Sequence, residues 1–425
     1  MIKNAMRNIY LLSLLGLLLS GCIGMTESIR PLTDNDHQYA SSDQELQLIA
    51  RAEAAHEELL SKGLMYRDQL VSDYIKLVGN SVTPPMTDGA AKINFYVLKD
   101  PSVNAMAFPN GNVYINIGLL ARLENEAQLA HVLSHEVAHV VHRHSLKTSY
   151  SRQNTIVAAH ITDLLMFGTS LAYLPYISQL AAYSQDQELE SDQFAMEYMY
   201  RANYDVRQAQ EVFRVIQETK VTESVPGSIY ASHPTHQQRV AQARQWIAAS
   251  YSQAPADAMI AAESYQSISE KITHLNLKLK LNDKQYQLTI EAADNALQKT
   301  MSDPWLWYYK GEAYRLMAEH PKSAAREYSW LHGKEAGDAG TLLQRFTDKK
   351  SEHLEKAQQV FREGLSRAGE LPQFHRGIGL VAYAKGDAQS AVNELQTYLD
   401  RAPTTKDKLY IEHLLQEIGE GQNAH

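Results

Sequence analysis

The segment His135-Glu136-Val137-Ala138-His139 decides both the fold and the chemistry that we expect of this chain. On an α-helix, residues i and i+4 share a face, so both imidazoles can reach one zinc ion while Glu136 accepts a proton from water. Apolar residues recur at helical spacing around the motif and indicate a buried helix. These residues are Leu129, Val132, Leu133, Val137, Ala138, Val140 and Val141. Burying the side chains of His135, Glu136 and His139 in such a helix would be costly without a partner such as a metal ion. The alternative is a helix with ordinary histidines on a solvated edge.

A zinc ion that supports hydrolysis needs a third protein ligand, with the fourth position left to water. His131 and His142 share the face of the central pair, but a helix rises about 1.5 Å per residue, so both lie too far along its axis. The metzincin extension is absent, because it requires glycine at position 142 and histidine at 145, which is Ser145 here. We therefore expect His142 and His144 at the surface or in support of the ligands.

A carboxylate ligand is available downstream, between residues 184 and 192. Ser184 and Gln187 form a potential capping box, which predicts that a helix begins there. Glu188 and Asp192 then share one face, whereas Glu190 points away. One of these two carboxylates can bind the ion and the other can orient a ligand histidine. The alternative is a solvated acidic helix start that the helix dipole favours.

Together the two motifs resemble those of the gluzincin metallopeptidases of the BepA, LoiP and HtpX type, H-E-x-x-H followed by E-x-x-x-D. The resemblance extends from about residue 90 to 245 and includes the segments 104–111 and 113–120. It also includes Ser232-His233-Pro234 with Arg239, which is similar to the S-H-P-x-x-x-x-R element of that family.

The resemblance implies one Zn²⁺ per chain, with three ligands, one general base and three supporting or regulatory residues. The ligands would be His135, His139 and Glu188, and the general base would be Glu136. The supporting or regulatory residues would be Asp192, His233 and Arg239. His233 would take the fourth zinc position and hold the site latent, and Arg239 would support that loop or the site. An extended substrate would add a strand to an edge strand made of Val113, Tyr114, Ile115 and Asn116, which can also be plain core structure.

The N-terminal residues 1–21 have the charged start and short apolar run of a secretory signal. The segment Leu19-Ser20-Gly21-Cys22 resembles a bacterial lipobox, and Cys22 is the only cysteine. We therefore predict a lipid anchor at Cys22, a tether over residues 22–45, and a periplasmic protein sorted to the outer membrane of a Gram-negative bacterium. The alternative is a cleaved signal followed by an incidental cysteine.

The charge balance argues against nucleic acid as a partner. The formal net charge is −9, and removal of residues 1–21, which hold Lys3 and Arg7 and no acidic residue, makes it −11. Residues 164–185 contain no charged side chain, a length close to that of a membrane span. Gly168 and Pro175 interrupt this stretch, so we favour packed helices or a lid beside the site over a span or a membrane-facing helix pair.

The chain beyond residue 250 is helical in pattern and carries a spacing of 34 residues. Gly311 and Gly379 lie two such periods apart, and residues 331–350 look like an insertion. The predicted fold class is therefore α+β and mostly helical: a zincin-type protease domain with a small sheet (46–250), then an all-α tetratricopeptide-like repeat domain (251–425). A non-repetitive helical bundle is the alternative.

Two classes of function follow. The first is a zinc endopeptidase of the cell envelope that cleaves misfolded or stalled envelope and outer-membrane proteins. Its repeat domain would form a concave surface that holds peptides or proteins, and the resemblance implies that this domain binds the outer-membrane assembly machinery. The second is a chaperone or assembly scaffold whose zinc site is latched. An intact Glu136 favours the enzyme, since a structural zinc site needs no base.

Overall fold

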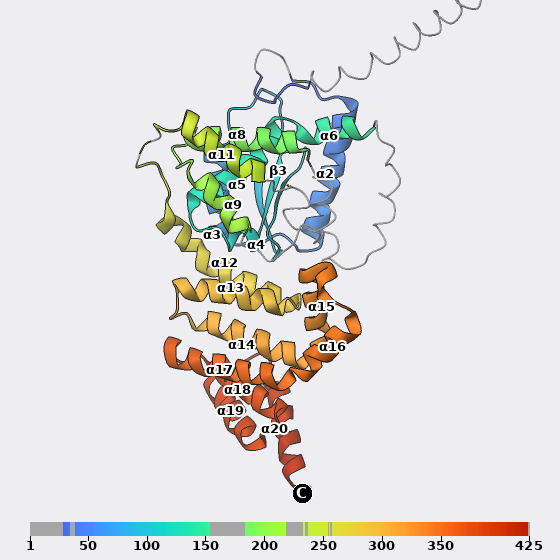
Figure 1. The fold of residues 1–425 in the computed structure, drawn as a ribbon, viewed down its shortest axis with the longest axis vertical. Coiled ribbons are helices and arrows are strands. Elements are labelled where there is room, and N and C mark those ends of the chain that lie inside the picture. Colours follow the sequence, from blue (N-terminus) through green and yellow to red (C-terminus); the bar gives the residue numbers. More distant parts are fainter. Residues whose placement is uncertain are drawn as a thin grey trace, which may run out of the picture. The chain divides into compact units, whose positions relative to one another are not determined.

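The computed structural model describes residues 29–34, 39–153, 183–217, 233, 237–253, 255 and 257–423, which form two compact units with a division between residues 266 and 267 (Figure 1). The mostly helical α+β fold class is confirmed. The predictions for the signal at 1–21, for Cys22 and for most of the uncharged stretch 164–185 lie outside the described residues. Within the part that is described, no helix combines the length and hydropathy needed to cross a membrane.

The first unit contains a small sheet among helices. Its helices are α2 (Asp43–Ser61), α3 (Gln69–Val82), α4 (Ile117–Leu120), α5 (Glu126–Val141), α6 (His144–Gln153), α8 (Gln185–Arg201), α9 (Gln208–Gln217) and α11 (Gln237–Ser250). Its strands are β1 (Asn94–Leu98), β2 (Ala105–Ala107) and β3 (Asn112–Asn116). Helix α8 begins with the capping box that the sequence predicted, formed by Ser184 and Gln187.

The strand order β1-β3-β2 makes β3 the central strand. Strand β1 runs parallel to β3, with Asn94 opposite Asn112, and β2 runs antiparallel, with Ala105 opposite Ile115. The prediction that substrate adds to an edge strand made of Val113, Tyr114, Ile115 and Asn116 is therefore wrong. Both edges of β3 are already paired, and its side chains are buried. Among the described strands, β2 is the edge strand that packs against α5.

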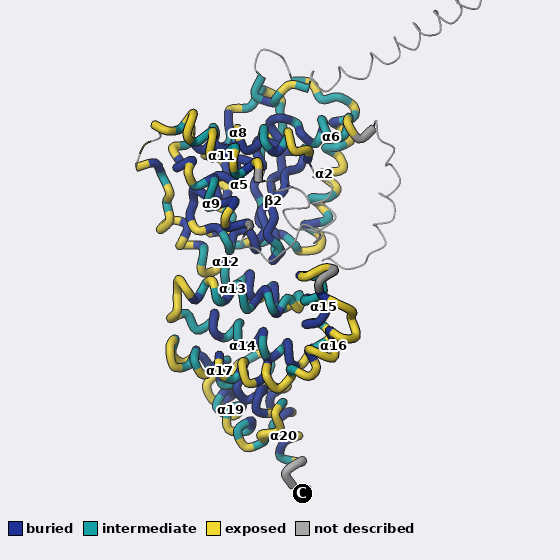
Figure 2. The backbone as a smooth tube through the Cα atoms, in the orientation of Figure 1, coloured by how far each residue is buried: buried dark blue, intermediate teal, exposed yellow. Residues whose placement is uncertain are grey.

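Helix α5 is the core element on which the site is built. Every residue from Glu126 to Val141 is buried, and the helix packs against α3, α8, α9 and β2, so its polar side chains face protein on all sides (Figure 2). Its N-cap Asn125 accepts a hydrogen bond from the backbone of Gln128. The turn that leads from β3 towards α5 needs a glycine, because a Cβ on Gly118 would lie 2.2 Å from the carbonyl oxygen of Pro101.

The segment after α11 also belongs to the first unit. The backbone of Met259 pairs with Asn203 and Asp205, and the N–H of Ala127 donates to the carbonyl of Ile260. Farther on, the buried Tyr265 packs near Tyr74 and donates its hydroxyl to the carbonyl of Leu120. Residues 251–266 thus pack with the first unit rather than with the helices that follow.

The second unit is all helical over its described residues. Its elements are the C-terminal part of α12 (Ala262–Asn282), α13 (Tyr286–Lys299), α14 (Pro304–Glu319), α15 (Pro321–His332), the 3₁₀ helix η2 (Gly333–Ala336), α16 (Ala339–Asp348), α17 (Lys350–Ala368), α18 (Pro372–Ala384), α19 (Ala388–Arg401) and α20 (Lys408–Asn423). Helix α14 packs most extensively on α17, and α18 packs on α19.

Two glycines explain the sequence spacing in this unit. Gly311 of α14 lies against the ring of Phe361 in α17, and Gly379 of α18 lies against Leu395 in α19, so each glycine lets two helices approach closely. The first pair is 50 residues apart and the second 16, a difference of 34 residues. The hairpin of α15 and α16 supplies this extra length between α14 and α17.

Candidate metal centre

Two histidines one turn apart form one side of the candidate metal centre. His135 and His139 on α5 direct their Nε2 atoms at each other, 3.0 Å apart. Both side chains are buried. Two adjacent imidazole nitrogens that share so little space need a bound cation or proton between them.

A carboxylate from α8 lies directly across from this pair. One oxygen of Glu188 is 3.4 Å from His135 Nε2 and the other is 3.4 Å from His139 Nε2. The Glu188 side chain is fully buried, because α8 packs along α5. Burial alone would raise the pKa of Glu188, but the charges of His233 and Arg239 outweigh it and hold that pKa well below its usual range.

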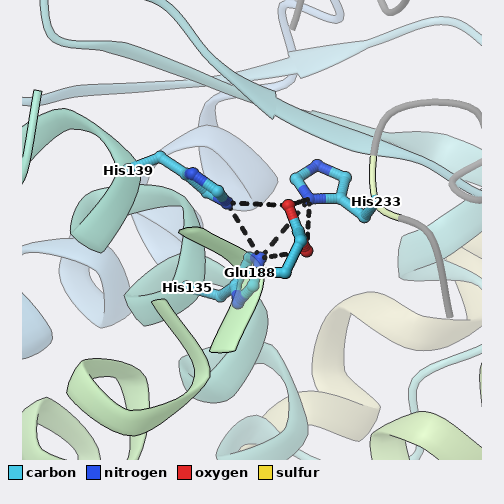
Figure 3. A group of neighbouring side chains, drawn as sticks. All are labelled: His135, His139, Glu188 and His233. Atoms are coloured by element: carbon cyan, nitrogen blue, oxygen red, sulfur yellow. Dashed lines mark hydrogen bonds and ion pairs between the residues drawn. The ribbon is translucent and has the colours of Figure 1, made fainter. Parts of the chain in front are cut away.

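His233 completes the group from a segment that precedes α11 (Figure 3). Its Nδ1 lies 3.4 Å from His135 Nε2 and 3.0 Å from a Glu188 oxygen. On its other side, Nε2 lies 3.4 Å from an oxygen of Glu136. The structure thus brings the histidine of the Ser-His-Pro element into contact with the motif on α5.

The four donor atoms fit a tetrahedral zinc ion. Each residue offers one ligand atom, and these atoms all lie within 4.8 Å of one another. Zinc bonds of about 2.0–2.1 Å in a tetrahedron place neighbouring ligand atoms about 3.3–3.4 Å apart. The separations given above range from 3.0 to 3.4 Å. Two or three imidazoles with one carboxylate are also a ligand set that suits zinc.

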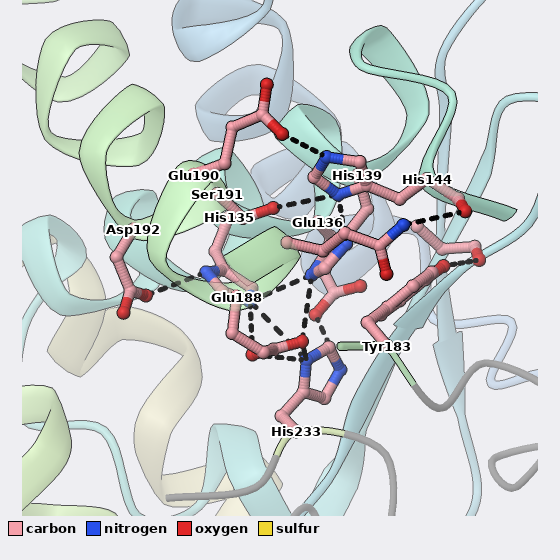
Figure 4. Close-up of polar contacts among 12 residues, drawn as sticks. His135, Glu136, His139, His144, Tyr183, Glu188, Glu190, Ser191, Asp192 and His233 are labelled. Atoms are coloured by element: carbon pink, nitrogen blue, oxygen red, sulfur yellow. Dashed lines mark hydrogen bonds and ion pairs between the residues drawn. The ribbon is translucent and has the colours of Figure 1, made fainter. Parts of the chain in front are cut away.

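A buried ion-pair network supports this group from behind. Asp192, one turn after Glu188 on α8, lies 3.0 Å from Nδ1 of His135 (Figure 4). Arg239 donates two hydrogen bonds to Asp192, both 2.7 Å long, and approaches Glu188 at 2.8 Å. Although burial opposes the charged form, the Arg239 guanidinium keeps the pKa of Asp192 low. Asp192 therefore faces the ring nitrogen that His135 does not direct at the site, which fixes how this ring is oriented.

A second support reaches His139 through His144, which is one of the two alternatives that the sequence left open for His144. Nδ1 of His139 lies 2.8 Å from Nδ1 of His144, and Nε2 of His144 lies 3.0 Å from Glu190 (Figure 4). When His139 binds a metal through Nε2, its Nδ1–H donates to His144, whose Nε2–H then donates to Glu190. Arg143 has a φ of +55° and ends the α5 helix, which turns His144 back towards His139. Helical periodicity gave no signal for this reversal.

Glu136 lies where it can act as an acid or a base beside these donors. It projects from α5 between the ligand histidines, is buried, and has one oxygen without a hydrogen-bond partner among the described residues. Burial raises its pKa, and the nearby charges of His233 and His135 oppose that rise. A carboxylate of raised pKa beside a metal centre is suited to accept a proton from water and to donate it again.

Tyr183 covers the face of His139. Their rings stack with centroids 3.8 Å apart and planes 15° apart. The Tyr183 hydroxyl points to the carbonyl oxygen of Ala107 on β2, 3.4 Å away. Ala105 and Ala107 direct their backbone groups away from β3, because Asn104 and Phe108 pair with β3 instead. The outward edge of β2 therefore lies beside the metal centre.

Comparison with known proteins relates residues of the first unit to one peptidase family. Residues 71–247 match the model of peptidase family M48. The chain is 26% identical over 190 residues to a putative beta-barrel assembly-enhancing protease of Vibrio cholerae, covering 42% of this chain and 39% of that protein. It is 25% identical over 199 residues to the beta-barrel assembly-enhancing protease of Escherichia coli K12, covering 44% and 41%.

A eukaryotic protein is also similar to part of this chain. The mitochondrial metalloendopeptidase OMA1 of Schizosaccharomyces pombe is 26% identical over 204 residues, which cover 46% of this chain and 60% of that protein. The chain spans about two fifths of the length of the bacterial relatives it matches. All four donors and Glu136 fall within the residues that match the family model.

Proposed function

We propose that this chain is a zinc-dependent endopeptidase of the bacterial cell envelope, because its residues 71–247 match the model of peptidase family M48. Its substrates would be misfolded or stalled envelope and outer-membrane proteins. Two relatives are named for enhancing beta-barrel assembly, which supports this class of substrate. The observation that carries the enzymatic part is the buried group of three imidazoles and a carboxylate with Glu136 beside it.

We assign His135, His139 and Glu188 as the protein ligands that remain during hydrolysis. A bound zinc ion supplies Lewis acidity, which lowers the pKa of water and polarises a carbonyl group. Glu136 accepts the proton of the attacking water and passes it to the leaving amine. Asp192 and Arg239 hold His135 and Glu188 in place, and the buried environment limits competing water.

The described conformation fits a latent enzyme. His233 takes the fourth donor position that hydrolysis needs for water, and it also faces Glu136. Tyr183 lies over His139 and contacts the outward edge of β2. We propose that an extended substrate pairs with β2 at Ala105 and Ala107, so both His233 and Tyr183 must move when substrate enters.

Substitution Glu136→Gln tests the proposal. The glutamine keeps the shape of the side chain but cannot act as a base, so cleavage of an unfolded protein should fall by at least about 100-fold while zinc content stays the same. Glu197→Gln, at a partly exposed position on α8, is the matched control and should cleave like the wild type. Equal cleavage by the wild type and Glu136→Gln contradicts the proposal, as does no cleavage even in a His233→Ala background.

The second candidate is a chaperone or assembly scaffold without protease activity. The saturated donor set, with His233 in the fourth position, is the observation that favours it. In that case a Glu136→Gln chain would replace the wild type fully in an envelope-assembly assay. For the enzyme, the same variant should instead hold uncleaved substrates, which proteomics of the captured envelope proteins would identify.

The location and partners are proposed from the sequence. Residues 1–21 would direct export, Cys22 would carry the lipid, residues 22–45 would act as a tether, and the helices after residue 250 would bind the outer-membrane assembly machinery. Labelling with a radioactive fatty acid tests the anchor: the wild type should incorporate label and Cys22→Ala should not. Label in both chains, or in neither, contradicts it.

A further inference from the structure

The cavity beside Glu136 has the position and chemistry of a substrate side-chain pocket. Its apolar walls are Val132 on α5 and Val212, Phe213 and Ile216 on α9. We propose that this pocket receives the side chain of the residue whose amine is released, and that it selects an aliphatic side chain there. This inference rests on the proposed peptidase function and adds the class of substrate sequence that the site cleaves.

The position of the cavity determines which substrate residue it can receive. His135, Glu136 and His233 form the end of the cavity nearest the metal centre. Glu136 hands its proton to the leaving amine, so that nitrogen must come within hydrogen-bond distance of the Glu136 carboxyl. The side chain attached one carbon from that nitrogen then lies on the Glu136 side of the centre. Tyr183 lies instead against His139, with its hydroxyl towards the carbonyl of Ala107 on β2.

The charges around the cavity are already compensated. Arg239 reaches its wall, but it donates to Asp192 and Glu188, and its guanidinium carbon lies 5.3 Å from the centre of the Phe213 ring. His131, the remaining polar wall residue, is buried one turn before His135. Burial lowers its pKa to about 3, so its ring is uncharged. Glu136, the carboxylate among the described residues of the wall, would repel an acidic side chain. The proposed reaction uses the same carboxylate for proton transfer, so it does not serve as the partner of a substrate lysine.

The composition of the cavity wall favours branched aliphatic chains. Two valines, an isoleucine and one aromatic ring offer contacts to methyl groups, and close packing makes such pockets sensitive to one methylene group. We therefore expect leucine, isoleucine, valine or methionine directly after the cleaved bond.

Two valines on the same helix provide a matched pair of variants. Val212 and Val215 are both buried on α9, with 3% and 4% of their surface exposed, but only Val212 lines the cavity. Val212→Ala and Val215→Ala delete the same atoms, so any general loss of packing on α9 should be similar in both. Only Val212→Ala should enlarge the pocket.

Cleavage-site profiling by mass spectrometry, on a mixture of unfolded proteins, measures the preference. The wild type and Val215→Ala should cut mostly before aliphatic residues. Val212→Ala should shift the ratio of aromatic to aliphatic residues at this position by about tenfold. A wild-type profile without an aliphatic preference, or a Val212→Ala profile equal to that of Val215→Ala, overturns the proposal.

A binding measurement separates this proposal from the proposed function. The probes are two peptide hydroxamates, which chelate the zinc, one with an isobutyl and one with a carboxyethyl side chain next to the chelating group. The isobutyl probe should bind the zinc-loaded wild type at least about tenfold more tightly, and Val212→Ala should reduce that ratio. Equal binding overturns the pocket assignment. Discrimination without any cleavage of protein substrates supports the pocket and contradicts the peptidase.

Discussion

The buried charges at the metal centre act as a unit at the scale of single residues. Arg239 is the one arginine or lysine in contact with both Asp192 and Glu188 among the described residues. Arg239→Met should lower the free energy of unfolding by about 3–5 kcal/mol, because it removes the guanidinium that pairs with both buried carboxylates. Thermal or urea unfolding of the first unit measures this effect.

The control for this prediction is the same change at an exposed arginine. Arg214 on α9 pairs with Glu124 and Glu211 at the surface, where an ion pair contributes about 0–1 kcal/mol. Arg214→Met should therefore change stability little. If both arginine variants lose the same stability, the buried network is not what holds the α8 carboxylates in place.

His144 is predicted to strengthen zinc binding without touching the ion. Because His144 accepts from His139 and donates to Glu190, His144→Gln should weaken zinc affinity by about 10–100-fold. Competition with a chelator of known affinity measures the change. The exposed His413→Gln is the control and should bind zinc as the wild type does. Unchanged affinity in His144→Gln would mean that the contact with His139 does not orient that ring.

The sequence identified the residues with fixed helical spacing better than those positioned by a turn. His135, Glu136 and His139 lie on one helix, and Glu188 and Asp192 on another, so the i and i+4 rule placed each set correctly on one face. The position of His144 depends on the positive φ of Arg143, which no periodicity reports. The contact of Tyr183 with His139 depends on tertiary packing and was not predicted.

At the scale of elements, the strand next to the metal centre illustrates the same limit. The alternation and length of residues 112–116 indicated a strand, and the structure has one there. Which strand lies at the edge depends on pairing between segments, and the three-residue β2 is too short to be recognised from its own sequence. The edge that faces the site is therefore β2, while β3 forms the centre of the sheet.

Helix α15 caps the start of α13 through Glu327. The buried carboxyl accepts hydrogen bonds from the backbone N–H groups of Gln287 and Leu288, at 2.9 and 3.1 Å. Burial raises the pKa of Glu327 from 4.5 to about 7, more than these bonds lower it. The folded state therefore keeps a proton that the unfolded chain releases between pH 4.5 and 7.

The second unit should for this reason be more stable at pH 5 than at pH 7.5. The contribution of protonated Glu327 to the free energy of unfolding is complete below about pH 4.5 and is lost as the pH rises to about 7. The loss amounts to at most about 1.4 kcal/mol per pH unit. Urea unfolding at both pH values checks this, with Glu327→Gln as the variant that should reduce the pH dependence and the exposed Glu355→Gln as its control. A pH dependence that is the same in all three chains contradicts the role of Glu327.

At the scale of the whole molecule, the packing of residues 251–266 with the first unit determines where a stable fragment of that unit must end. A fragment that ends at residue 250 lacks Tyr265, whose buried ring and hydroxyl contact the first unit. A fragment that ends at residue 266 should be more stable than one that ends at residue 250 by about 3–5 kcal/mol, the usual cost of losing a buried aromatic side chain. Thermal unfolding of the two fragments measures the difference, and equal stabilities would contradict this assignment.

Three imidazoles and one carboxylate should hold a single zinc ion in the metal centre. X-ray absorption spectroscopy of the purified, zinc-loaded chain counts the imidazole ligands and measures the bond lengths. We predict one zinc ion per chain, four ligands at about 2.0–2.1 Å and three imidazoles, falling to two in His233→Ala. Zinc that is absent, or an imidazole count that does not change when His233 is removed, would contradict the four-donor centre.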